Sequence, residues 1–315
     1  MAQSSPAPLL RIGTRGSPLA LAQAHAVRAR LAAAHGCEPE RLPIVTIRTS
    51  GDMIQDRPLA EAGGKGLFTK EIEEALAAGA IDVAVHSAKD MPTLLPVGLA
   101  IAACLPREDA RDAFISRKAA TLAALKPGAV VGTASLRRQA QVLRLRPDVA
   151  VVSLRGNVGT RLAKIEAGAV DATLLALAGL RRLGLQQAAT ALLDVEDFLP
   201  AVGQGIVALE TRENDDHARE SLFSIDDDDA RTALLAERGF LSALDGSCRS
   251  PIAGHATIGS GQVRFRGLIL LPDGSEVLET QRVGGVAEAA ALGRDAGAEL
   301  RGRASPAFLA GFATG

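Results

Sequence analysis

The sequence is poor in aromatic residues and has no tryptophan or tyrosine. Aromatic residues make up 3% of its 315 residues, and all 8 of them are phenylalanine. Proteins that bind single-stranded nucleic acids stack bases on aromatic side chains, so a surface of that kind is not expected. An excess of charge of one sign is also lacking, since 35 basic and 36 acidic residues leave a formal net charge of -1. General binders of nucleic acids or membrane surfaces are usually basic, and we therefore expect neither partner.

Cysteine is scarce, and long apolar runs are absent. The 3 cysteines lie far apart and do not form a disulfide framework, and the 5 histidines show no metal-ligand spacing with one another or with the cysteines. No run of about 18 uncharged apolar residues exists that could span a membrane. The first residues lack the basic and apolar regions of a secretory signal. We expect a cytoplasmic monomer with no obligate protein partner and no bound metal.

The composition and the alternation of sequence patterns predict an α/β fold. Hydrophobic residues make up 47% and charged residues 23%, so the chain can bury sizeable cores. Its length corresponds to about two domains, or to three smaller ones. Over the first 200 residues, short β-branched runs alternate with helical patterns, which is typical of largely parallel sheets. The predicted strands are Leu9–Thr14, Pro43–Thr49, Ile81–His86, Leu99–Cys104, Ala129–Thr133, Val149–Leu154 and Asp171–Ala176, and the predicted helices run from Ser17 to Gly36 and over Leu67–Ala78, Leu136–Leu145 and Val158–Ala167.

After about residue 225 the pattern changes. Four consecutive acidic residues precede a helical stretch over Ala230–Leu244, and their charge suits a helix N-terminus. Three strands over Ile252–Ile258, Val263–Leu271 and Glu276–Val283 come next, followed by a helix over about Ala287–Arg301. Strands followed by a helix indicate a small separate α+β domain.

Hydroxyl and cationic residues follow the predicted strands at the points where helices begin. In α/β sheets, ligands bind beyond the carboxyl ends of the strands, and helix N-termini with arginine, serine and threonine suit anions. The positions are Thr14, Arg15, Gly16, Ser17, Thr49, Ser50, Gly51, Asp52, Ser87, Lys89 and Asp90 in the first part of the chain, and Thr133, Ser135, Arg137, Arg138, Arg155, Gly156, Asn157 and Arg161 in the second. The two sets predict an anion-binding edge on each of two lobes.

Arg137 and Arg138 lie in the first turn of a predicted helix, where cations oppose the helix dipole. An anion beside them would remove that cost, so the pair favours a bound anion over two ordinary solvated side chains. For Arg15, which precedes a helix N-cap, an anion-binding role and a solvated surface role fit about equally well.

Two further segments could carry chemistry. Gly63–Gly66 resembles a phosphate cradle but lacks the spacing of a P-loop, so a loop with a solvated Lys65 and a loop that closes over substrate both fit. Asp90 follows Lys89 at a strand end. In isolation it would be a plain surface ion pair, but among so many cations its ionised form is favoured. Such a carboxylate could stabilise a positive charge that develops during a reaction.

Among the cysteines, Cys248 has the setting of a reactive residue. It lies between Gly246 and Pro251 and beside Arg249, which predicts an exposed, electropositive loop that favours the thiolate. Cys104, in an apolar strand, is expected to be inert and buried. His86 ends an apolar strand and is interpreted as a hydrogen-bonded structural histidine.

Eight segments, taken together, resemble the porphobilinogen deaminase family, also called hydroxymethylbilane synthase. They occur in the order found in that family and extend over about residues 10–256. The segments are Ile12–Gln23, Gly63–Leu76, Val85–Pro92, Gly132–Gln141, Leu154–Ile165, Leu175–Gly184, Ala201–Glu210 and Gly246–Ala256.

The resemblance implies a transferase that condenses porphobilinogen, with release of ammonia, into the linear tetrapyrrole hydroxymethylbilane. This is a step of heme and chlorophyll-type tetrapyrrole biosynthesis. The resemblance also implies a dipyrromethane cofactor, built from substrate and bound by a thioether to Cys248. Asp90 matches the catalytic aspartate of the family, which would hydrogen-bond pyrrole N–H groups and stabilise cationic intermediates.

The resemblance further implies that arginines and hydroxyls hold the acetate and propionate groups of cofactor and substrate. Positions that match cofactor contacts are Ser87, Lys89, Thr133, Ser135, Arg137, Arg138 and Arg161, and positions that match substrate contacts are Arg15, Ser17, Gln23, Lys65, Arg155 and Arg182.

The family fold implies two lobes like those of periplasmic binding proteins, with mixed, mostly parallel sheets, and a small α+β C-terminal domain that carries the cysteine loop. Domain 1 would comprise residues 1–105 with 206–224, domain 2 residues 106–205, and domain 3 residues 225–315.

Two other functions fit the residues when the resemblance is set aside. A non-catalytic binding protein for a small anion would use the same strand-end cations, but it needs neither Cys248 nor Asp90. A phosphoryl-transfer enzyme would use the Gly63–Gly66 loop. A covalent adduct of dipyrromethane size on the purified chain would favour the deaminase, whereas thermal stabilisation by nucleotides would favour phosphoryl transfer.

Overall fold

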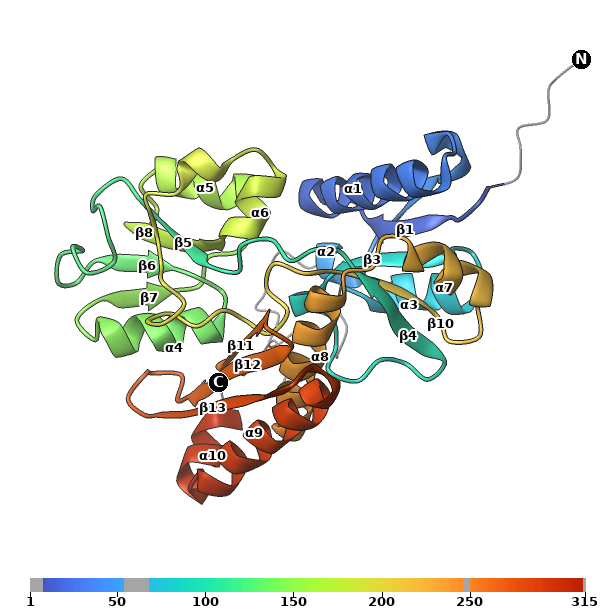
Figure 1. The fold of residues 1–315 in the computed structure, drawn as a ribbon. Helices are drawn as coiled ribbons and strands as arrows, with labels where there is room; N and C mark the ends of the chain where they lie inside the picture. Colours follow the sequence, from blue (N-terminus) through green and yellow to red (C-terminus); the bar gives the residue numbers. More distant parts are fainter. Residues whose placement is uncertain (1–7, 54–67, 246–249, 314–315) are drawn as a thin grey trace, which may run out of the picture. The chain divides into compact units, whose positions relative to one another are not determined.

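A computed structural model of the chain describes residues 8–53, 68–245 and 250–313 (Figure 1). They belong to two compact units, one made of residues 1–106 and 206–231 and the other of residues 107–205 and 232–315. The second unit contains two separate sheets. The predicted division of the chain into three domains stays a prediction. Among the helices of the described ranges, none has the length and apolar character needed to cross a membrane.

The first unit contains a five-stranded mixed sheet in the order β2-β1-β3-β10-β4. β1 (Ile12–Arg15) pairs in parallel with β2 (Ile44–Ile47) and β3 (Val83–Ser87), whereas β10 (Val207–Arg212) runs antiparallel to β3 and β4 (Leu99–Cys104). The carboxyl ends of the three parallel strands therefore lie along one edge of the sheet, as the sequence predicts.

The helix that follows β1 begins and ends at the predicted residues. The Ser17 hydroxyl is its N-cap and accepts a hydrogen bond of 3.3 Å from the backbone N–H of Ala20. Gly36 ends the helix in the left-handed conformation at φ 57°, which glycine adopts without steric cost. The helices of this unit are α1 (Pro18–His35), η1 (Pro39–Arg41), α2 (Ser50–Met53), α3 (Lys70–Ala77), η2 (Ala88–Asp90) and α7 (Asp216–Phe223).

Alternate residues of β3 contact different helices, because successive side chains of a strand point to opposite faces. Val83 and Val85 belong to a core cluster with Ala24, Val27 and Leu31 of α1. The intervening Ala84 packs instead with Ile72 and Leu76 of α3. Helices α1 and α3 therefore cover the two faces of the sheet, and neither face is left for a ligand. A ligand would bind at the carboxyl edge.

The second unit repeats this topology with the strand order β7-β6-β8-β5-β9. Parallel pairs join β6 to β7 and β8, and β5 runs antiparallel to the central strand β8. Most elements lie where the sequence predicts them, but β5, α6 and β9 were not predicted. The elements are β5 (Asp112–Ser116), β6 (Val130–Gly132), α4 (Leu136–Leu145), β7 (Ala150–Val152), α5 (Val158–Glu166), β8 (Ala172–Ala176), α6 (Leu177–Arg182), η3 (Gln186–Ala188) and β9 (Ala191–Leu192).

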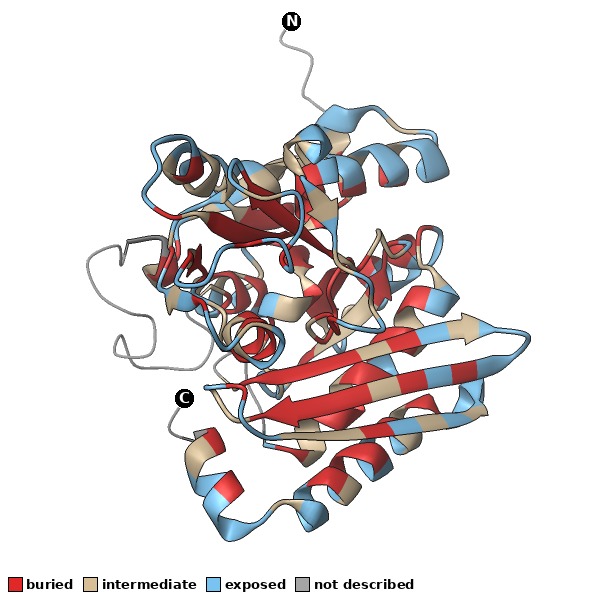
Figure 2. Cartoon of the chain, turned by 90° about the vertical axis from the view of Figure 1, so that its left-hand side faces the viewer, coloured by how far each residue is buried: buried red, intermediate tan, exposed pale blue. Residues whose placement is uncertain are grey.

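The same unit ends in a three-stranded antiparallel sheet in the order β11-β12-β13. Figure 2 shows that β11 and β12 are buried along one part of their length and become exposed toward the other. Its core includes Phe240 and Phe265, whose ring centroids lie 5.0 Å apart. The elements are α8 (Asp228–Ala243), β11 (Ile252–Gly259), β12 (Gln262–Leu270), β13 (Val277–Gly285), η4 (Val286–Glu288), α9 (Ala289–Arg303) and α10 (Pro306–Ala313).

The close approach of α9 to α8 yields a stability prediction. A Cβ placed on Gly293 would lie 1.9 Å from the carbonyl oxygen of Ala236, whereas one on Gly302 in the same helix meets nothing within 4 Å. Gly293→Ala should therefore lower the free energy of unfolding by about 1–3 kcal/mol through overpacking. Gly302→Ala should raise it by roughly 0.5–1 kcal/mol, because alanine is the better helix former. Urea unfolding followed by circular dichroism measures both, and equal effects of the two changes would contradict the close helix contact.

Candidate active site

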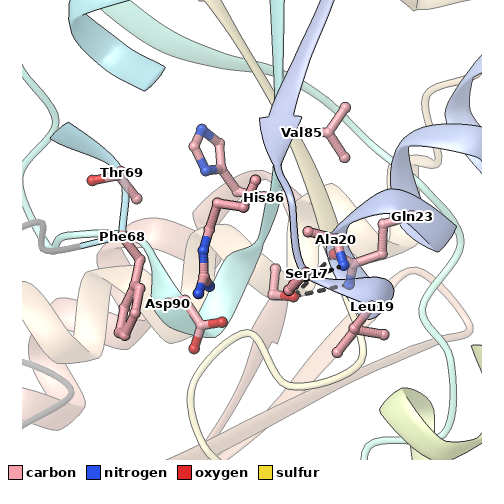
Figure 3. Close-up of a pocket in the computed structure, with 11 residues that line it drawn as sticks. Ser17, Leu19, Ala20, Gln23, Phe68, Thr69, Val85, His86 and Asp90 are labelled. Atoms are coloured by element: carbon pink, nitrogen blue, oxygen red, sulfur yellow. Dashed lines mark hydrogen bonds between the residues drawn. The ribbon is translucent and has the colours of Figure 1, made fainter. Parts of the chain in front are cut away.

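A pocket in the first unit lies at the carboxyl edge of the sheet. Residues from β1 and β3, from the start of α1, from η2 and from the segment before α3 line it (Figure 3). The described residues that line it are Arg15, Ser17, Leu19, Ala20, Gln23, Phe68, Thr69, Val85, His86, Ser87 and Asp90. Five of the residues predicted for the site, including Asp90, therefore line one pocket.

Asp90 is held at the pocket by the short η2 turn that continues β3. The backbone N–H of Ala88 donates a 3.0 Å hydrogen bond to the carbonyl of Ile206, and Met91 donates 3.3 Å back to Ala88. Ala88 and Met91 are buried, whereas the Asp90 side chain is exposed. The turn thus fixes the backbone on both sides of a carboxylate that solvent or a ligand can reach. Lys89, in the same turn, is half-buried.

Polar groups on the opposite side of the pocket come from the start of α1. The side-chain amide of Gln23 donates a 2.8 Å hydrogen bond to the Ser87 hydroxyl and so joins α1 to the end of β3. Ser17 caps the same helix N-terminus, where the dipole favours a negative group.

Arg15 approaches the pocket from the end of β1. Its guanidinium lies over the ring of Phe68, 4.2 Å from the ring centroid. Such stacking orients the planar group without using its N–H donors. Arg15, Ser17 and Gln23 thus place donors in the pocket that contains the Asp90 acceptor.

In the second unit, the predicted residues follow β6 and β7 at the corresponding edge of that sheet. Thr133 is buried, and its hydroxyl accepts a 3.1 Å hydrogen bond from the backbone N–H of Ser135. Ser135 is the N-cap of α4, as predicted, and accepts from the backbone N–H of Arg138 at 3.4 Å. The hydroxyls here organise the start of α4.

Arg137 and Arg138 are buried and share one carboxylate, that of Asp112 on β5. Arg137 donates to one oxygen of Asp112 at 2.8 Å, and Arg138 donates to the other at 3.1 and 2.7 Å. The side chain of Asp112 is 0% exposed. Burial alone would raise its pKa, but the two guanidinium groups hold the pKa well below its usual range. The anion beside these helix-start arginines is therefore one that the chain itself supplies.

Two of the remaining predicted arginines of this unit donate side-chain hydrogen bonds to backbone carbonyls. Arg161 donates to the carbonyl of Gly156 at 2.8 Å, and Arg182 donates to that of Gly205 at 2.7 Å. Arg155 is half-buried just after β7, and its carbonyl accepts a hydrogen bond of 3.3 Å from Lys164.

Several predicted positions lie outside the described residues: Lys65 with the whole Gly63–Gly66 motif, and Cys248. The structure also brings residues to the site that the sequence does not single out. Phe68 and Thr69 line the pocket just before α3, whereas the sequence predicts them only as the start of a helix. Asp112 was missed although Arg137 and Arg138 indicated an anion, because their charges give no sign of its position in the chain.

The predicted burial of Cys104 and the predicted hydrogen bonding of His86 are both confirmed. Cys104 is buried, as predicted, and Cys37 is half-buried. His86 is hydrogen-bonded, as predicted, with Glu210 as its partner. Within residues 8–53, 68–245 and 250–313, no group of three histidine, cysteine, aspartate or glutamate side chains is arranged to hold a metal ion.

Each of the two α/β sheets has hydroxyl and arginine side chains near the carboxyl ends of its parallel strands, and the first also has the exposed carboxylate of Asp90. A family model described as porphobilinogen deaminase, dipyromethane cofactor binding domain, matches residues 10–220. A second, described as porphobilinogen deaminase, C-terminal domain, matches residues 231–302. The chain belongs to the porphobilinogen deaminase family.

Curated relatives agree with this assignment. The chain is 63% identical to the porphobilinogen deaminase of Nitrobacter winogradskyi, over 97% of this chain and 96% of the relative. It is 54% identical to that of Paracoccus denitrificans, over 95% of this chain and 96% of the relative. Among solved structures, it is similar to the methionine-binding protein MetQ at 12% identity, over 70% of this chain and 91% of that one, with a TM-score of 0.45.

The residues of the pocket fit a dipyrromethane, the cofactor for which the first family model is described. Such a group carries pyrrole N–H donors and several carboxylates. The exposed Asp90 carboxylate can accept from the N–H groups. Arg15, Ser17 and the N-terminus of α1 supply donors for carboxylates. The pocket therefore offers an acceptor for the N–H groups of the cofactor and donors for its carboxylates.

The shared carboxylate of the second unit yields a prediction. Asp112→Asn should lower the free energy of unfolding by about 3–5 kcal/mol, because it leaves two buried arginines without their counter-charge. The exposed pair Arg117–Glu166 of the same unit provides a control, and Glu166→Gln should leave the unfolding midpoint nearly unchanged. Urea unfolding of both variants measures the difference. A midpoint of Asp112→Asn as high as that of the control would show that the buried pair is not required.

Proposed function

We propose that this enzyme, which condenses porphobilinogen into hydroxymethylbilane with release of ammonia, carries out the condensation in the Asp90 pocket. The observation that carries the proposal is the exposed carboxylate of Asp90, fixed by a buried turn in a pocket with Arg15, Ser17 and Ser87. Pyrroles present N–H donors and this substrate also presents carboxylates, so a pocket with one acceptor among cationic and hydroxyl donors suits both.

Asp90 acts as a hydrogen-bond acceptor and a fixed negative charge. It accepts from pyrrole N–H groups and so orients each ring. When ammonia departs, positive charge develops on the substrate ring, and the carboxylate already present stabilises it without reorganisation. The cofactor, when bound, supplies the pyrrole carbon to which the first substrate unit is joined.

The other assigned side chains bind and orient carboxylates. In the first unit, Arg15, Ser17 and Gln23 contact substrate, and Ser87 and Lys89 contact cofactor. In the second unit, substrate is bound by Arg155 and Arg182, and cofactor by the sheet-edge groups Thr133, Ser135, Arg137, Arg138 and Arg161. A buried Nε of Arg137 that makes no hydrogen bond to the described chain supports a further partner for that guanidinium.

The proposal includes the attachment of the cofactor and the organisation of the chain. Cys248 forms the thioether, and Lys65 belongs to a loop that contacts substrate. The chain works as a cytoplasmic monomer of three domains, residues 1–105 with 206–224, 106–205 and 225–315, without a nucleic acid, membrane or obligate protein partner. The near-neutral net charge of -1 supports the absence of nucleic-acid and membrane binding.

The mass of the intact purified protein tests the attachment. The wild-type chain should exceed its sequence mass by an adduct of dipyrromethane size. Cys248→Ser should show the sequence mass alone, because a hydroxyl is a much weaker nucleophile than a thiolate. Cys37→Ser is the matched control and should keep the adduct. An adduct that persists in Cys248→Ser would place the attachment elsewhere.

The role of Asp90 is tested by Asp90→Asn, which keeps the shape of the side chain and removes its charge. Turnover of porphobilinogen should fall about 100- to 1,000-fold, since the developing cation loses its fixed counter-charge. The adduct mass and the unfolding midpoint should stay as in wild type. The exposed Asp216 of α7 supplies the control, and Asp216→Asn should retain full turnover. Turnover of Asp90→Asn within about threefold of wild type would refute the assigned role.

A further inference from the structure

The C-terminal sheet (β11–β13) packs on α4, the helix whose first turn contains Arg137 and Arg138 (Figure 1). The turn between β12 and β13 lies against the backbone of this helix. A Cβ on Gly274 in that turn would lie 2.5 Å from both the carbonyl oxygen of Ala140 and the backbone nitrogen of Arg144. Gly274 also has φ 73°, a left-handed conformation that glycine adopts without steric cost. The backbone conformation and the close approach to α4 therefore both require glycine here.

Side chains of the same sheet share a hydrophobic cluster with α4. Ala140 of α4 is completely buried in this cluster, together with Ala253 of β11 and Leu268 of β12. Leu199, from the segment before β10, belongs to the same cluster. Close-packed interiors contain few voids, so a displacement of one element is passed to the elements packed against it. We therefore expect α4 and the C-terminal sheet to move as one body.

A second connection joins β11 to the guanidinium group of Arg137 through two consecutive backbone carbonyls. The carbonyl of Pro200 accepts a 3.1 Å hydrogen bond from the backbone N–H of Gly254 in β11. The carbonyl of the preceding residue, Leu199, accepts a 2.8 Å hydrogen bond from the Arg137 guanidinium and one of 3.0 Å from the side-chain amide of Gln141. The sheet thus contacts the helix backbone directly and contacts the Arg137 side chain through this segment.

We propose that the C-terminal sheet positions Arg137 and Arg138 for the reaction, and that Gly274 is a positioning residue. This inference rests on the proposed function, which assigns the two arginines to carboxylates of the cofactor. A shift of α4 would move both guanidinium groups and so misplace the accepting pyrrole ring. The substrate contacts assigned to the first unit would stay as they are. The turnover number therefore depends on the sheet, whereas the KM for porphobilinogen does not.

The first test compares Gly274→Ala with Gly261→Ala, in the other turn of the same sheet. Gly261 has φ 72°, but a Cβ there meets nothing within 4 Å, so both changes strain the backbone and only Gly274→Ala adds a clash with α4. In protein that carries the cofactor adduct, Gly274→Ala should lower kcat about 10- to 100-fold and keep KM within about twofold. Gly261→Ala should keep both constants. Equal kcat values for the two variants would overturn the proposal.

A second measurement on the same variants does not depend on turnover. The Nε–H signals of Arg137 and Arg138, followed by NMR on the folded protein, should shift in Gly274→Ala and stay at their wild-type positions in Gly261→Ala. Unmoved signals in a folded Gly274→Ala protein would show a contact that only stabilises the fold, and would overturn the positioning role. A wild-type chain that carries no adduct and releases no ammonia would instead refute the proposed function, and the NMR comparison distinguishes the two failures.

A milder pair of substitutions tests the same contact if Gly274→Ala does not fold. Leu268 lies in the cluster with α4, whereas the next residue, Ile269, faces the opposite side of the sheet and the core that contains residues of α8 and α9. Leu268→Val and Ile269→Val each remove one methylene group. Only Leu268→Val should shift the two arginine signals and lower kcat, by about threefold or more. Equal shifts from the two changes, or none from either, would overturn the proposal.

Discussion

A carboxyl group that is completely removed from water needs a hydrogen-bonding or oppositely charged partner, and each unit of this protein supplies one near the carboxyl ends of its parallel strands. In the second unit Asp112 pairs with Arg137 and Arg138, and in the first unit Glu210 is hydrogen-bonded to His86. The buried acids lie on the antiparallel strands β5 and β10, while their basic partners lie at or after parallel strands. Burial of charge therefore fixes the side chains around which each site is organised.

This constraint explains why the sites can be both rigid and reactive. A guanidinium held by a buried carboxylate has one orientation, which lowers the entropy lost when a ligand binds. The η2 turn serves Asp90 in a comparable way, through backbone hydrogen bonds and the buried Met91 rather than through charge.

Much of the fold follows from local sequence signals. The caps Ser17, Gly36 and Ser135 predict the ends of α1 and the start of α4, because the capping interactions lie within a few residues of the chain. The strand-end rule similarly brings Arg15, Ser17, Ser87 and Asp90 into one pocket. β5 and β9 could not be found in this way, since each is a short strand whose hydrogen-bonded partner strand lies far away in the sequence.

The sequence also could not predict which residues pair with the buried charged side chains. Two arginines at a helix start indicate that an anion is near, but not whether it belongs to a ligand or to the chain. Only the register of β5 against β8 identifies Asp112. The same holds for His86, whose partner Glu210 is 124 residues away and reaches it through the β3–β10 pairing.

The position of β10 between β3 and β4 has a consequence for biosynthesis on the ribosome. The first sheet cannot be completed when its N-terminal segment emerges, because its fourth strand is translated only after the whole second sheet. Until Arg212 has left the exit tunnel, β3 and β4 each present an unpaired edge, which is the kind of surface that invites aggregation. Nascent chains of this protein should therefore depend on chaperones for longer than the size of its first lobe alone suggests.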